Sequence, residues 1–227
     1  MSTRLLSALV AGIALLVAGC SGGGDSAAGA GDAASGAPAT TQSGPKYTQF
    51  ADFPGQALAT TESGMDLGIQ VKAVDAVWTP SLADVPAKGG SHYLAVYVAV
   101  TGELADRGVQ KAKIKYLQLR YDNPGGKKCD PYAPDEAPKY CFKEAYPASD
   151  LRDEVADNTW RDEKWQADSL MGRDIGKGET KIGVVGFSVT DSEKAEGLQL
   201  CGPTKEDSVD TGKFPCVPIP KPEGARS

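Results

Sequence analysis

The sequence predicts an all-β fold, an antiparallel β-sandwich that follows a long polar tether. Several segments alternate apolar with other residues at the two-residue period of strands. Clusters of Gly, Pro, Asn and Asp separate these segments, at residues 88–91, 122–126 and 176–178. Many short strands joined by such turns are typical of sandwiches and barrels.

Residues 93–101 (YLAVYVAVT) give the strongest strand prediction, because β-branched and aromatic residues alternate there between two faces. Residues 67–77 alternate too, with Leu67, Ile69 and Val71 inward, but lose register near Ala73 and Val74, which predicts a bulge. Further strands are expected at residues 113–121, 181–190 and 198–200, and an edge strand at residues 56–61.

The stretch from residue 149 to residue 170 is poor in strand signals. Ser149 and Asp150 could cap a short helix, with Asp153 and Glu154 in its first turn. We therefore expect one or two helical turns here and no helical domain.

The N-terminus predicts export and a lipid anchor at Cys20. After Arg4, the apolar run at residues 5–19 is too short for a mature membrane helix, which needs about 20 residues. It fits a signal peptide, and its end, Val-Ala-Gly-Cys at residues 17–20, resembles the lipobox of bacterial lipoproteins. There the cysteine receives a diacylglycerol and fatty acids such as palmitate, which hold the protein on the cell membrane. The alternatives are an ordinary signal cut near Gly19 and an uncleaved anchor.

The rest of the chain divides into a linker and one domain. Residues 20–46 are nearly all small or polar, so they cannot offset their chain entropy by burial and should be disordered. Such a tether has an r.m.s. span of roughly 28 Å. The signal peptide is thus residues 1–19, the lipidated cysteine and linker 20–46, and the folded domain 47–227. The net charge of −6 argues against nucleic acid as a partner.

Four cysteines remain outside the lipid site, and an even number in an exported chain predicts disulfides. We favour the local pairs, Cys129 with Cys141 and Cys201 with Cys216, because each encloses a Pro-rich, turn-forming segment. The two crossed connectivities stay open. A zinc site is disfavoured, since neither pair has the close spacing that structural zinc needs.

Two segments resemble the immunoglobulin-like domain of unknown function found in lipoproteins of Gram-positive, especially actinobacterial, bacteria. One is residues 93–101, followed here by Gly102 where the family commonly has Asn. The other, residues 178–189 (GETKIGVVGFSV), is similar to the family's Gly-Glu-Thr turn, glycine-containing strand and buried Phe. The resemblance covers residues 65–200. It implies an immunoglobulin-like β-sandwich, an extracytoplasmic location and a binding role, with no catalytic residues.

No motif predicts catalysis, a cofactor or a metal. His92, the single histidine, adjoins Ser91 and has Asp84 nearby in sequence, but one strand end rarely gives triad geometry. The turn at residues 172–178 has the wrong spacing for a phosphate loop. Residues 150–168 are acidic, which suggests either a solvated charged face or calcium; the interleaved basic residues favour the first.

Four aromatic residues in polar sequence are candidates for a binding surface. Trp160 and Trp165 are either plugs that cover a sheet or exposed anchors. Tyr132 and Tyr140 belong to the segment between Cys129 and Cys141, which is either a stiff binding loop or a stapled hairpin without a partner.

The sequence therefore predicts a lipid-anchored binding module of the cell envelope rather than an enzyme. Its expected partners are membrane lipid through Cys20 and an envelope protein or cell-wall ligand. One alternative is a cell-wall hydrolase that works through two carboxylates. Another is a purely structural or immunogenic surface protein.

Overall fold

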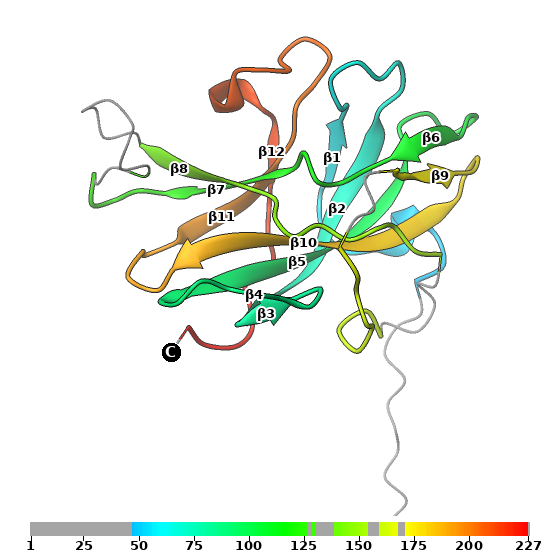
Figure 1. Cartoon of the computed structure of the whole chain (residues 1–227). Coiled ribbons are helices and arrows are strands. Elements are labelled where there is room, and N and C mark those ends of the chain that lie inside the picture. The colour runs from blue at the N-terminus through cyan, green and yellow to red at the C-terminus, as the bar shows by residue number, and fades with distance from the viewer. Residues whose placement is uncertain (1–46, 127–128, 130–138, 154–158, 168–170, 227) are drawn as a thin grey trace, which may run out of the picture. The chain divides into compact units, whose positions relative to one another are not determined.

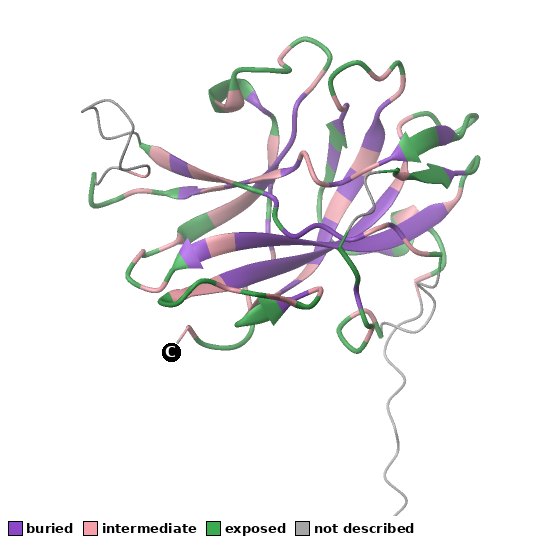
Figure 2. Cartoon of the chain, in the orientation of Figure 1, coloured by how far each residue is buried: buried purple, intermediate pink, exposed green. Residues whose placement is uncertain are grey.

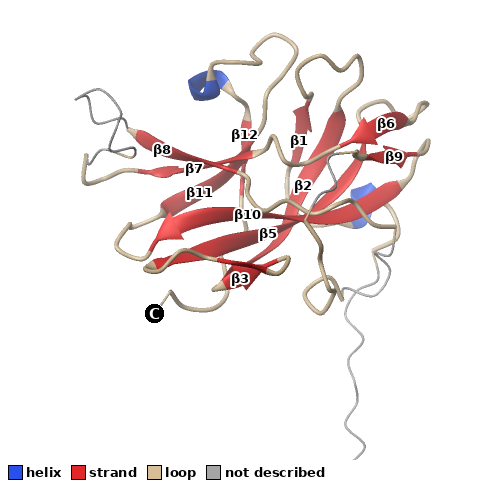
Figure 3. Cartoon of the chain, viewed as in Figure 1, coloured by secondary structure: helices blue, strands red, loops and turns tan. Residues whose placement is uncertain are grey.

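The structure, a computed structural model, describes residues 47–126, 129, 139–153, 159–167 and 171–226. In these residues the chain is built from antiparallel strands, and its helical parts are two short 3-10 turns (Figure 3). These are η1 (Phe50–Asp52) and η2 (Thr211–Lys213). The predicted all-β fold with antiparallel sheets is confirmed.

The first sheet holds the long strands. In spatial order it consists of β1 (Ala57–Thr60), β2 (Ile69–Thr79), β5 (Ser91–Gly102) and β10 (Thr180–Thr190). The strands predicted at residues 67–77, 93–101 and 181–190 are confirmed, and the predicted edge strand at residues 56–61 does lie at one end of the sheet. β10 forms the other end.

The predicted bulge in β2 is confirmed and decides where a carboxylate lies. The register with β5 shifts between Ala73, opposite Val98, and Asp75, opposite Tyr97. This extra residue turns Asp75 to the outer face of the sheet, where Tyr97 also lies. Without the shift, the Asp75 carboxylate would point into the apolar core, at a large desolvation cost.

The second sheet packs against the first (Figure 1). In spatial order it consists of β12 (Cys216–Pro218), β11 (Glu196–Cys201), β7 (Gln118–Asp122) and β8 (Tyr140–Glu144). Val98 and Phe187 from the first sheet share one core with Leu119 and Leu200 from the second, and all four are fully buried. Two short antiparallel pairs flank the sheets: the hairpin of β3 (Ser81–Leu82) with β4 (Val85–Pro86), and the pair of β6 (Val109–Ala112) with β9 (Arg173–Ile175), which are distant in sequence.

The strand predicted at residues 113–121 is shorter than expected, because β7 begins only at Gln118. Residues before it form a turn in which the Leu117 N–H donates to the Ile114 carbonyl at 3.2 Å. Ile114 and Leu117 are both buried. Their apolar character, which made the segment read as a strand, therefore reflects burial in a loop.

The first sheet is covered on its outer face as well, so β5 and β10 are buried on both sides (Figure 2). Tyr93, Tyr97 and Val184 form a second apolar cluster there. Residues 47–53 and the β3–β4 pair pack against it, as does Trp165.

The segment at residues 146–152 runs along the free edge of β10 and is not helical, although a helix was expected to begin at Ser149; Glu154 of its expected first turn lies outside the described residues. Arg152 and Ile182 exchange two backbone hydrogen bonds at 2.8 Å, and the Gly186 N–H donates to the Pro147 carbonyl at 2.7 Å. The Ser149 hydroxyl caps no helix but accepts from the Val184 N–H at 2.9 Å. A Cβ on Gly186 would meet the Pro147 Cδ at 3.1 Å and the Pro147 carbonyl oxygen at 3.2 Å, so glycine favours the close approach of this segment.

Candidate functional site

The two tryptophans named as candidates lie over the outer face of the first sheet. The Trp165 side chain is only 6% exposed, and its Nε1 donates to the Trp160 carbonyl at 2.8 Å. The half-buried Trp160 donates from its own Nε1 to Asp75 at 2.9 Å and stacks near Tyr47. This is the arrangement of plugs that cover a sheet.

The tyrosine candidates lie elsewhere. Tyr140 begins β8 in the second sheet and is half-buried, with the Arg120 guanidinium 4.8 Å from its ring centroid. Tyr132 lies outside the described residues. The structure thus brings Trp160 and Trp165 together, but gives them no contact with Tyr140 among the residues it describes.

Both predicted disulfides are present, Cys129–Cys141 and Cys201–Cys216. The second joins directly opposed residues of β11 and β12. Two disulfides in one chain indicate an oxidising compartment outside the cytoplasm. Cys20 lies outside the described residues.

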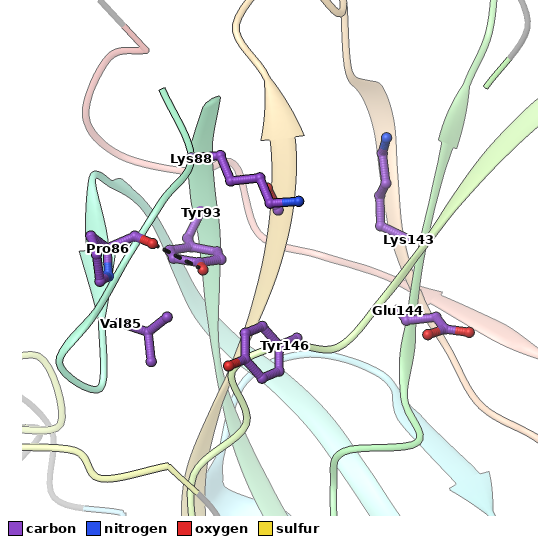
Figure 4. A pocket seen from close by; sticks show the side chains of 8 residues that line it. Val85, Pro86, Lys88, Tyr93, Lys143, Glu144 and Tyr146 are labelled. Atoms are coloured by element: carbon purple, nitrogen blue, oxygen red, sulfur yellow. Dashed lines mark hydrogen bonds between the residues drawn. The ribbon is translucent and has the colours of Figure 1, made fainter. Parts of the chain in front are cut away.

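A pocket of about 380 Å³ lies beside β10, where the first sheet meets the end of β8 (Figure 4). Segments far apart in the sequence line it. They contribute Pro86, Lys88, Tyr93, Lys143, Tyr146 and Ser188. In Figure 4 the two tyrosine rings lie between Pro86 on one side and Lys143 on the other.

The two tyrosines differ in their exposure. Tyr93 is 4% exposed and its hydroxyl is directed at the Pro86 carbonyl, at 3.5 Å. Burial raises the pKa of the Tyr93 phenol above its usual range, and the nearby Tyr146 adds to the rise. The phenol therefore remains a hydrogen-bond donor at neutral pH. Tyr146 is 65% exposed, although its backbone is fixed by a 2.8 Å hydrogen bond from its N–H to the Gly186 carbonyl.

The pocket has two lysines at its rim. Lys143 pairs with Glu193 at 3.2 Å, and the same glutamate accepts from the Tyr121 hydroxyl at 2.9 Å. Lys88 is exposed and forms no ion pair with any described residue. The pocket thus combines aromatic surface with the ammonium group of Lys88, which has no ion-pair partner among the described residues, and with the carboxylate of Glu144.

The described residues form neither a Ser-His-Asp triad around His92 nor a metal-binding cluster. His92 contacts Asp191, with 2.6 Å between Nδ1 and Oδ1, and not Asp84. No group of three metal-ligating side chains occurs in the described part of the chain. In the acidic stretch, Glu163 pairs with Arg152 and Asp153 with Lys181, as expected for a charged surface held by ion pairs.

The chain matches no family model, and comparison with curated proteins and with solved structures also found no match. Within the described ranges, no helix has both the length and the apolar character needed to cross a membrane.

Sequence patterns alone do not indicate the pocket, because Tyr93 belongs to a strand and Tyr146 to a loop that is distant from it in sequence. The usable signal was the large aromatic Tyr146 directly before a proline and next to the polar Lys143 and Glu144. Its meaning depends on the approach of β10, which is distant in sequence.

Proposed function

We propose that this protein is an exported, lipid-anchored module of the cell envelope that acts by binding. In this proposal Cys20 carries the lipid, residues 20–46 form the tether, and residues 47–227 form an immunoglobulin-like domain whose ligand site is the pocket of Tyr93 and Tyr146. The two disulfides and the shared core of two antiparallel sheets support the location and the fold class.

The observation that carries the proposal is the exposure of Tyr146 beside a formed pocket. Its ring is 65% exposed, while its backbone is held against β10 and Tyr93 is buried next to it. A large aromatic side chain on a fixed backbone loses less entropy on binding than one on a mobile loop, and it excludes water from a partner's surface. Such rings dominate the binding energy of protein interfaces.

The test is site-specific photocrosslinking in intact envelopes. A benzophenone amino acid replaces Tyr146 in one variant and Val209, which is 87% exposed and is not among the residues that line the pocket, in the control. We expect a crosslinked product of defined mass at position 146 and none at position 209. Equal labelling at both positions, or no product at position 146, would contradict a ligand site in the pocket.

A further inference from the structure

The edge of β10 is only partly covered. Residues 146–152 bond to it at Ile182, Val184 and Gly186, as the hydrogen bonds of the Arg152, Ser149 and Tyr146 N–H groups demonstrate. Before Tyr146 the chain turns to the other sheet, where the Ala145 N–H donates to the Leu117 carbonyl at 3.2 Å. Among the described residues, the edge beyond Gly186 therefore has no hydrogen-bonded neighbouring strand.

The free groups on this edge belong to Ser188. In an antiparallel ladder, successive residues point their backbone groups to alternate sides, so Ser188 has the same orientation as Ile182, Val184 and Gly186. Its N–H and C=O thus point away from β5 and bond to no described residue. Two residues later the edge closes, because the Thr190 carbonyl accepts from Glu193 at 2.9 Å.

Ser188 also lines the tyrosine pocket. A chain that paired with it would continue the line of residues 146–152 as an added strand. One of its side chains would then face Tyr93, which is opposite Ser188 in the ladder, and the exposed ring of Tyr146. The next would fall on the other side of the sheet, since side chains alternate along a strand.

The charge at the rim selects among extended peptides. Lys88 lines the same pocket and has no ion pair among the described residues, whereas Lys143 already forms an ion pair with Glu193. A carboxylate next to Lys88 would gain a charge-assisted hydrogen bond. A basic side chain would find a carboxylate in the lining at Glu144, whose side chain points away from Tyr146 in Figure 4.

We infer that the pocket binds an acidic peptide segment in extended conformation, which adds to β10 at Ser188 and places a carboxylate at Lys88. The inference rests on the proposed function and names the class of its partner. The edge offers only one complete pair of backbone hydrogen bonds, each worth about fivefold in affinity. Most of the affinity must come from the tyrosines and from Lys88, so the recognised segment is short.

The probe is a phage-displayed library of random decapeptides, selected on the full exported protein. We expect the enriched peptides to alternate β-branched residues and to carry Asp or Glu at one fixed position. The best peptide is then synthesised with and without N-methylation of the residue that donates to the Ser188 carbonyl. N-methylation should weaken binding at least tenfold, because it removes that donor and blocks close approach of the strand.

Lys88→Gln should weaken binding of the acidic peptide about tenfold, as expected for loss of a charge-assisted hydrogen bond. The matched control is Lys177→Gln, because Lys177 is an exposed turn residue outside the pocket lining. Equal binding of the N-methylated peptide, or no effect of Lys88→Gln, would overturn the inference. If the library yields no binders but a glycan is crosslinked at position 146, the peptide class is refuted and the proposed function stands. If the library yields no binders and nothing is crosslinked at position 146, the inference and the proposed function are both refuted.

Discussion

Replacing Trp165 with alanine should destabilise the domain strongly, because the structure gives this residue a covering role. Its side chain is 6% exposed, donates a 2.8 Å hydrogen bond to the Trp160 carbonyl and lies 5.0 Å below the Arg152 guanidinium. Removing a buried tryptophan costs about 3–5 kcal/mol. A domain of this size loses about 2–4 °C per kcal/mol, so the melting temperature should fall by roughly 10 °C.

The assay is urea unfolding and thermal melting of the full exported chain, with partner capture from envelope extract measured in parallel. Trp165→Phe should be intermediate, since it keeps most of the apolar contact but loses the N–H donor. Met171→Ala is the surface control, because Met171 is 69% exposed. The reasoning is refuted if Trp165→Ala keeps the parent's unfolding midpoint and selectively loses partner capture, which would make Trp165 a binding anchor.

Three further predictions concern charge, crosslinks and the anchor. Burial raises the pKa of Asp75, but hydrogen bonds from Arg161 and Trp160 outweigh it and hold the pKa below the usual 3.8. Asp75→Asn should therefore cost about 2 kcal/mol at pH 7, a deficit that shrinks as the pH falls below 3.8 in pH-dependent unfolding. Replacing both Cys201 and Cys216 with serine should cost about 3 kcal/mol in urea unfolding without reductant. Cys20→Ala should abolish fatty-acid labelling and release the protein from membranes; unchanged labelling would contradict the lipoprotein assignment.

The parts of the fold that local patterns determine were predictable. The alternation of residues 93–101 identified β5, and the break near Ala73 and Val74 identified the bulge in β2. Local pairing of the cysteines was predictable because the intervening segments contain turn-forming prolines.

The parts that depend on distant segments were not predictable. Ile114 and Leu117 are apolar because they are buried in a loop, and periodicity cannot distinguish their spacing from that of a strand. Ser149 is a residue type that favours helix caps, but its hydroxyl accepts a hydrogen bond from the Val184 N–H of β10 instead. β10 also creates the pocket, because only its approach brings Tyr146 beside Tyr93.

The most direct test of a binding module that uses the tyrosine pocket is hydrogen–deuterium exchange. The purified protein is measured alone and after addition to envelopes that lack it. The account predicts added protection in residues 143–149 and 186–190, which line or border the pocket, and none in residues 205–212. The Tyr146→Ala variant, whose fold should be unaffected because that ring is largely exposed, should lose the added protection. Protection confined to residues 159–167, or unchanged in Tyr146→Ala, would contradict the account.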